Sequence, residues 1–219
     1  MISKKMILDN TGKDISAKLK KMNYNLITYL KNDNDKSISE LILGNIQEFE
    51  DENIINIKEY LFRACRELTK VNLPKCITIG MNAFERCQSL ESIELPECIT
   101  LDTAFSYCTA LKKIELPKCI ELRNFATFQY CKSLSVITLP ECTGLNGYTF
   151  QNCSALETVD LPKCTDVGYY SFQDCTALSN VNLPECEEVG TRSFLRCTAL
   201  SKIIFQKIKR MEVGAFEDC

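Results

Sequence analysis

The sequence predicts a repeat solenoid, in which short coils of chain stack on one another and share one core. Two markers that recur in phase along the 219 residues predict it. The first, Leu-Pro-x-Cys, begins at Leu73 and returns in steps of 22, 21, 23, 22 and 22 residues, with a degenerate last copy 22 residues further on at Phe205. The second, Phe-x-x-Cys, runs in the same phase from Phe62 to Phe216. Self-similarity at a fixed period indicates stacked supersecondary units.

The segment before each Leu-Pro predicts a short strand. In Leu90-x-x-Ile93-x-Leu95 apolar and polar residues alternate, which is typical of a strand with one face turned inward. The strands of successive coils are expected to pair in parallel, and the Pro ends each strand because it has no N–H to donate. The phenylalanines are expected to stack as a spine behind this sheet. The residue before each Phe is small from the second coil onward, which fits close approach between coils.

These motifs carry a resemblance to a known family. The stretch from Leu90 to Cys98 fits the leucine-rich-repeat template. With the phased Ala-Phe-x-x-Cys half and the Leu-Pro junction, residues 37–219 resemble the BspA-like leucine-rich repeats, which occur in bacterial surface proteins and in some parasitic protists. The resemblance implies a right-handed superhelix with a parallel β-sheet on one face and short turns or 3-10 segments on the other. It also implies a cell-surface protein for adhesion or protein binding.

The two ends of the chain depart from the repeat. Residues 1–36 place apolar side chains at helical spacing and predict an N-terminal helical cap, which shields the first coil. Residues 37–219 then form about eight coils. The first coil is expected to begin with a weak copy at 38–46 and to carry an acidic insertion, a loop, near 47–54. The last coil is incomplete, so its exposed core residues are a candidate assembly end: Phe205 and Phe216.

Composition narrows the function classes. The chain has no His, which removes Ser-His-Asp and Cys-His catalysis and every His-ligated metal site. The net charge of -3 argues against a nucleic-acid binder. Neither a secretory leader nor a membrane span is predicted, because no apolar run is long enough. A protein without enzymatic activity, metal or cofactor is expected.

All 14 cysteines fall on the two markers and are expected to form two internal columns, a cysteine ladder. Buried reduced thiols that act as small apolar groups are the favoured interpretation. Disulfides between coils come second, because side chains in register point the same way and not at each other. Zinc comes last, because one thiol per coil in a line cannot supply four tetrahedral ligands. Free thiols would suit a reducing or anaerobic setting.

The residue after each Pro forms a third column, in which the charge alternates. Neighbours one coil apart are expected to attract each other, and a slip of one coil would bring like charges together. This column is interpreted as structural. Its members are Lys75, Glu97, Lys118, Glu141, Lys163, Glu185 and Lys207.

The solvent-facing side of the sheet supplies the first set of candidate binding residues, since repeat proteins commonly bind partners along such a surface. It holds no aromatic residue and no Arg, the types that favour strong binding. Glu94 and Glu115 are expected on neighbouring strands, where weak cation binding is the most they should do without a cleft. The candidates are Lys70, Asn72, Ser92, Glu94, Lys113, Glu115, Thr138, Thr158, Asp160, Asn180 and Asn182.

Aromatic residues near the Phe-x-x-Cys marker are the second set. Two interpretations remain open: an exposed apolar strip that marks an interaction site, or tyrosines packed between coils with only the hydroxyl in water. The 9-residue step from Cys119 to Phe128, one longer than usual, suggests a local bulge. The candidates are Tyr107, Phe125, Tyr130, Tyr148, Tyr169 and Tyr170.

Two functions agree with these patterns. The first is a non-enzymatic module that binds a protein or surface ligand of unknown identity through the repeat surface. The second is a structural component, for example of a surface appendage or virion, that self-associates through its C-terminal coil. The varied polar columns favour the first, and the exposed last coil favours the second.

Overall fold

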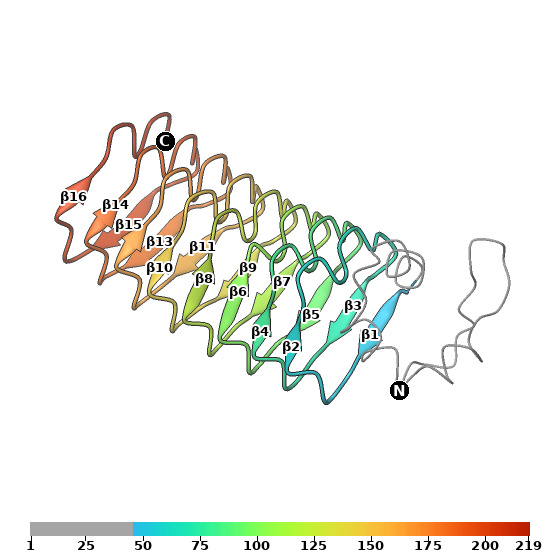
Figure 1. Ribbon diagram of the computed structural model, residues 1–219. Helices are drawn as coiled ribbons and strands as arrows, with labels where there is room; N and C mark the ends of the chain where they lie inside the picture. Colours follow the sequence, from blue (N-terminus) through green and yellow to red (C-terminus); the bar gives the residue numbers. More distant parts are fainter. Residues whose placement is uncertain (1–45) are drawn as a thin grey trace, which may run out of the picture.

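The chain winds into a β-solenoid, seen side-on in Figure 1. The structure, a computed structural model, describes residues 46–219. Within that range the chain forms sixteen strands, two in each coil, and no helix. The predicted helical cap (1–36), the domain boundary at 37 and most of the weak copy at 38–46 lie outside the described residues. The predicted class, a leucine-rich-repeat type of solenoid built on parallel strands, is confirmed.

The first ladder is the sheet that the Leu-Pro segments predict. Its strands pair in parallel, and the central residue of each turns inward, as Ile93 and Ile114 do between exposed neighbours. Pairing runs β1-β3-β5-β7-β9 and then β11-β13-β15. The strands are β1 (Glu48–Glu50), β3 (Lys70–Asn72), β5 (Ser92–Glu94), β7 (Lys113–Glu115), β9 (Val136–Thr138), β11 (Thr158–Asp160), β13 (Asn180–Leu183) and β15 (Lys202–Phe205).

A second ladder, which the repeat markers did not predict, lies on another side of the coils (Figure 1). It forms because the residues after each Leu-Pro-x-Cys also alternate, with Ile79 and Leu101 buried between polar neighbours. Pairing runs β2-β4-β6-β8 and then β10-β12-β14-β16. The strands are β2 (Asn56–Ile57), β4 (Thr78–Ile79), β6 (Thr100–Asp102), β8 (Glu121–Arg123), β10 (Gly144–Leu145), β12 (Asp166–Val167), β14 (Glu188–Val189) and β16 (Arg210–Met211).

The third side of each coil is a turn built on Phe-x-x-Cys. The backbone there also bonds to the next coil: the Phe62 amide donates to the carbonyl of Ala83 at 2.8 Å, and the Phe84 amide to that of Ala104 at 2.9 Å. The residues two before and two after each Phe take positive φ, as at Asn82 (53°) and Arg86 (61°). These left-handed residues let the chain reverse tightly while its amides still point along the stack.

The predicted phenylalanine spine runs through the core. Phe62, Phe84 and Phe105 are at most 1% exposed, and their rings stack with centroids 5.0 and 5.4 Å apart. The stacking continues to Phe216 at similar spacing. The small residue before each Phe, such as Ala83, is fully buried and allows this approach.

The expected acidic insertion near 47–54 is wrong. Glu48–Glu50 is strand β1, and it pairs with β3 so that Glu48 lies beside Lys70 and Phe49 beside Val71. That offset is 22 residues, the same as in later coils. Phe49 packs its ring 4.8 Å from Phe62 and takes an inward place in the coil. The acidic side chains occupy the outward positions of an ordinary strand, and no residues are inserted.

The predicted bulge after Cys119 is present. The extra residue is Phe125, which is 50% exposed between two left-handed residues, Asn124 (φ 57°) and Ala126 (φ 61°). The second ladder breaks at this coil, between β8 and β10, and the first ladder breaks one coil later, between β9 and β11. One additional residue therefore disturbs the strand register while the phenylalanine spine continues through it.

The alternating charge column forms discrete pairs. Each lysine bonds to the Glu of the coil before it: Lys118 to Glu97 at 2.6 Å and Lys163 to Glu141 at 2.5 Å. Lys207 pairs with Glu185 in the same way. These pairs are about half exposed, so each contributes only a few tenths of a kcal/mol, about what an exposed pair is worth. The column is structural, as predicted, although each charge is held by one neighbour and not by two.

Candidate functional site

The two cysteine columns are internal, as predicted. In the Phe-x-x-Cys column each Sγ donates to the carbonyl of the preceding coil's Phe, as Cys87 does to Phe62 at 2.9 Å. In the Leu-Pro-x-Cys column each Sγ donates two residues ahead, as Cys76 does to Thr78 at 3.4 Å. All 14 thiols are free, and 13 of them are buried. These contacts give the cysteines a structural role, as bonds between and within coils.

Burial also governs the acidity of these thiols. It raises the pKa of Cys76 and Cys142 to about 11 and that of Cys131 to about 12, because a thiolate there would lose its water. Nucleophilic chemistry needs a thiolate, so these thiols are poorly suited to it. Within residues 46–219 no three acidic or thiol side chains gather as they would around a metal ion.

The sheet-face candidates lie on the outer side of the first ladder, exposed or half-buried, and in the expected columns. Several of these side chains bond one another. Lys113 pairs with Glu115 at 2.8 Å, and the Asn182 amide donates to Asp160 at 2.8 Å. Glu94 and Glu115 are register neighbours, as predicted, in a shallow hollow beside Lys113. Internal pairing leaves this face few unsatisfied groups to offer a partner.

The aromatic candidates separate into two groups. Tyr107 and Tyr130 stack on each other, with centroids 4.6 Å apart and half-buried rings. The other four make one connected set, here called the aromatic cluster: Phe125, Tyr148, Tyr169 and Tyr170. Each of the two interpretations describes part of what is found. Tyr148 and Tyr170 are packed, stacked 5.4 Å apart, whereas Phe125 and Tyr169 are exposed.

Local backbone explains why these two rings are exposed. Phe125 is the extra residue of its coil and has no inward position to fill. The ring of Tyr169 lies directly over Gly147, where a Cβ would come within 2.6 Å of the tyrosine Cζ. It meets Phe125 at 5.8 Å and Tyr148 edge-on at 5.0 Å. Phe125 and Tyr169 together form an exposed surface, here called the ring shelf.

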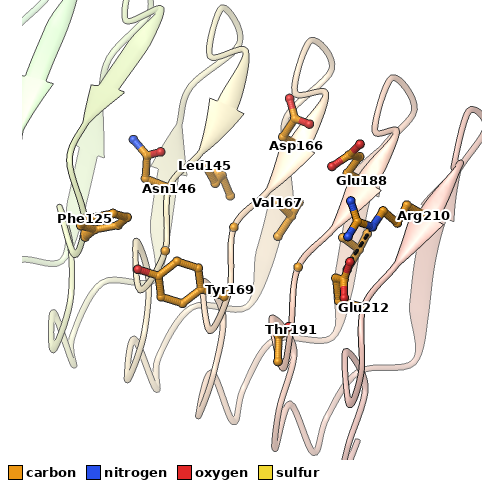
Figure 2. Close-up of a pocket in the computed structure, with 14 residues that line it drawn as sticks. Phe125, Leu145, Asn146, Asp166, Val167, Tyr169, Glu188, Thr191, Arg210 and Glu212 are labelled. Atoms are coloured by element: carbon orange, nitrogen blue, oxygen red, sulfur yellow. Dashed lines mark ion pairs between the residues drawn. The ribbon is translucent and has the colours of Figure 1, made fainter.

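The ring shelf borders a groove across the second ladder, drawn in Figure 2. Its sides come from strands β10, β12, β14 and β16 and the residues that follow them. The close-up shows Phe125 and Tyr169 at one end, with Asp166 and Glu188 along one rim. Gly168 and Gly190 lie in its floor, where a Cβ would be within 3 Å of the backbone of the preceding coil. The absent side chains keep the groove open.

The charge of this groove is negative. Asp166 and Glu188 are register partners on paired strands, and neither makes an ion pair with any described residue. The one cation in the lining, Arg210, bonds to Glu212 at 2.5 Å, drawn as a dashed line in Figure 2. Sequence reasoning missed both acids. Their signal was the polar column before each buried [VIL]-Gly position, which becomes visible only once a second ladder is recognised.

The last coil lies at the other candidate site. Phe205 and Phe216 are half-buried, and the Phe216 ring stacks on Phe194 at 5.1 Å. Met211 is 49% exposed, whereas its register partner Val189 is fully buried. The core positions of this coil therefore keep one apolar side in solvent.

Two parallel ladders, a phenylalanine spine and inward thiols, repeated about every 22 residues, define a leucine-rich-repeat solenoid. More particularly, the chain belongs to the BspA type leucine-rich repeat family, whose model matches residues 43–140 and 100–219 in six copies. No curated protein is significantly similar to the chain.

Solved structures share the fold. A leucine-rich repeat protein of T. pallidum is 23% identical, with a TM-score of 0.58 over 81% of this chain and 78% of that one. A leucine-rich cell surface protein of Faecalibacterium prausnitzii is 21% identical, with a TM-score of 0.57 over 73% of this chain and 61% of that one. Identities this low establish the fold alone. Within residues 46–219 no helix could cross a membrane.

Proposed function

We propose that the protein is a non-enzymatic binding module that holds a protein partner in the groove of the second ladder. The observation that carries the proposal is the ring shelf, where two large aromatic residues, 50% and 38% exposed, stand at the end of a groove. Aromatic side chains dominate binding energy when a partner covers them. Exposed apolar surface beside a groove marks an interaction site more often than scattered single residues do.

The groove is a better docking surface than the sheet face of the first ladder. On that face Lys113 and Asp160 already have partners within the chain, so a ligand would have to break existing contacts. It also lacks an aromatic anchor, and its one large exposed apolar residue is Val136. The sheet-face residues stay candidates for peripheral contacts, which add specificity and little affinity.

Adhesion at a cell surface is part of the proposal. It draws support from membership in the BspA type family and from the F. prausnitzii protein of the same fold, which is described as a cell surface protein. A repeat solenoid suits this role because its stacked coils present a long, rigid surface.

A display selection tests the proposal. A library of random linear peptides is selected on the full chain, and the enriched clones are then compared on variants. Binding should fall at least about tenfold on Phe125→Ala/Tyr169→Ala, the loss of about 1.4 kcal/mol or more that two buried anchors would contribute. It should stay unchanged on Val136→Ser, which removes an exposed apolar residue from the other ladder. No enrichment, or clones indifferent to the ring shelf, would overturn the proposal.

A second function, assembly through the last coil, is favoured by one observation. Met211 and Val213 are 49% and 81% exposed, and Phe205 and Phe216 lie half-buried beside them. Covering this apolar surface with a second copy would remove it from water. Light scattering after size exclusion should then give a mass above 24.9 kDa that returns to the monomer in Phe205→Asp. A monomeric wild-type chain would reject the assembly function.

A further inference from the structure

We infer that the partner segment is cationic: the groove takes an extended peptide that lays an apolar side chain on the ring shelf and sets a Lys or Arg between Asp166 and Glu188. This inference rests on the proposed function, because it names the ligand of the same groove. Three features of the second ladder carry it, namely two unpaired carboxylates in register, the exposed rings and the distance between the two.

The carboxylates come first. Paired parallel strands lie about 4.8 Å apart, so two acids in register repel each other at close range. Their neighbours in the same coils are neutralised: Glu187 bonds to Lys209 at 2.7 Å, and Glu185 to Lys207 at 2.5 Å. Asp166 receives only a hydroxyl, from Thr165 at 2.6 Å. The fold therefore supplies a lysine to each adjacent acid and leaves this pair without one.

The other ladder offers a comparison. Glu94 and Glu115 are also acids in register on paired strands. There the chain provides its own cation, because Lys113 pairs with Glu115 at 2.8 Å. That pair has no exposed aromatic residue beside it in the lining of its hollow. The two pairs share their geometry, and the one beside the ring shelf is the one to which no described residue brings a cation.

The spacing suits an extended peptide. Asp166 and Tyr169 are three residues apart on one strand and its continuation, which corresponds to about 10 Å at the usual rise. An extended ligand with the same rise places an apolar residue on the ring shelf and a basic residue at the carboxylates, with two residues between them. The stem of Lys or Arg can lie along the apolar floor made by Leu145 and Val167, since such stems pack well on apolar surface.

The probe is a fluorescent peptide containing Leu-Ser-Gly-Arg in an uncharged Gly-Ser background. Its binding to the full chain is measured by anisotropy. A matched peptide carries citrulline for arginine, which keeps the shape and removes the charge. Asp166→Asn/Glu188→Gln should weaken the arginine peptide about tenfold or more and leave the citrulline peptide unchanged. The matched double variant Glu94→Gln/Glu115→Gln should bind both peptides as the wild type does. Added salt should weaken only the arginine peptide.

The outcomes separate this inference from the proposed function. Equal binding of the arginine and citrulline peptides, lost on Tyr169→Ala, would overturn the cation site and keep the groove as a binding site. The same conclusion would follow if Asp166→Asn/Glu188→Gln, with an unchanged melting temperature, bound the arginine peptide normally. If neither peptide bound, or if both bound independently of Tyr169, the inference and the choice of this groove would fail together. Display clones that need the ring shelf yet lack basic residues would contradict the inference alone.

Discussion

At the scale of single residues, the thiols show how the fold decides reactivity. Thirteen of them lie inside the coils, and Cys219 alone is exposed. Iodoacetamide at about pH 8 should therefore modify Cys219 rapidly in the native protein and the other thiols only in urea, because alkylation needs an accessible thiolate. Peptide mapping by mass spectrometry measures the sites. Fast modification of Cys142, buried within its coil, would contradict the expectation.

The raised thiol pKa values also predict how stability depends on pH. The pKa of the Cys142 thiol is about 11 in the folded chain, against an ordinary value of 9.0. Above about pH 9 the unfolded state therefore binds fewer protons than the native state, so rising pH favours unfolding. The contribution of this thiol is complete below pH 9 and is lost as the pH rises to about 11.

Comparison with Cys142→Ala isolates this effect from tyrosine and lysine titration. The free energy of unfolding of the wild type should exceed that of the variant at pH 7. The gap should narrow by at most about 1.4 kcal/mol per pH unit between about pH 9 and 11. Urea unfolding followed by circular dichroism measures both proteins. A gap that stays constant over this range would mean that the thiol is not desolvated as the structure has it.

At the scale of single elements, the second ladder depends on glycine where coils approach most closely. A Cβ at Gly168 would meet the backbone of the preceding coil at 2.6 Å, both at the carbonyl carbon of Asn146 and at the amide nitrogen of Gly147. A Cβ at Gly144, on strand β10, would find its nearest neighbour at 3.9 Å. Gly168→Ala should therefore destabilise by about 1–3 kcal/mol, the usual cost of overpacking.

Gly144→Ala is the matched control, on a neighbouring strand of the same ladder. Its effect should stay within about 0.5 kcal/mol, as for a substitution without steric conflict. Urea midpoints at constant m-value compare the two variants. Equal effects would show that the loss of glycine itself matters, through backbone entropy, and not the approach of the coils.

The elements also show what sequence can and cannot predict here. The spine, the first ladder and the bulge at Phe125 followed from the spacing of Leu, Phe and Cys, because core positions repeat with little variation. Strand β1 was misplaced because Leu43-Gly44 imitates Leu-Pro, whereas the structure uses Phe49 at the inward position one segment later. The imitation has the right local pattern, and only pairing with β3 decides between the two registers.

The candidate site was partly predictable for the same reason. Phe125 and Tyr169 stood out as large residues beside a spacing irregularity. Asp166 and Glu188 did not, because a two-residue strand such as β12 or β14 is too short to give a periodic signal. Their significance comes from pairing across coils, which places residues 22 apart side by side. A polar column acquires meaning only after the second ladder is known.

At the scale of the whole molecule, stability should be distributed along the stack. In a solenoid each coil contacts mainly its neighbours, so the total is close to a sum of nearest-neighbour terms. The Phe128 ring stacks on Phe105 and on Phe150, 5.6 and 5.4 Å away. Phe216 stacks on Phe194 and, within the described residues, has no stacked ring beyond it. A central deletion should therefore cost more than one in the last coil.

Phe128→Ala should lower the free energy of unfolding by about 3–5 kcal/mol, the usual cost of removing a buried phenylalanine. Phe216→Ala should cost clearly less, because its ring is only half-buried. Phe125→Ala, an exposed phenylalanine outside the spine, should stay within about 0.5 kcal/mol and controls for the residue type. Urea unfolding at several protein concentrations measures all three. If Phe216→Ala cost as much as Phe128→Ala, and only at high concentration, the last coil would be covered by a second copy in solution. Equal costs at every concentration would contradict the nearest-neighbour description, since a half-buried ring would then be worth as much as a fully enclosed one.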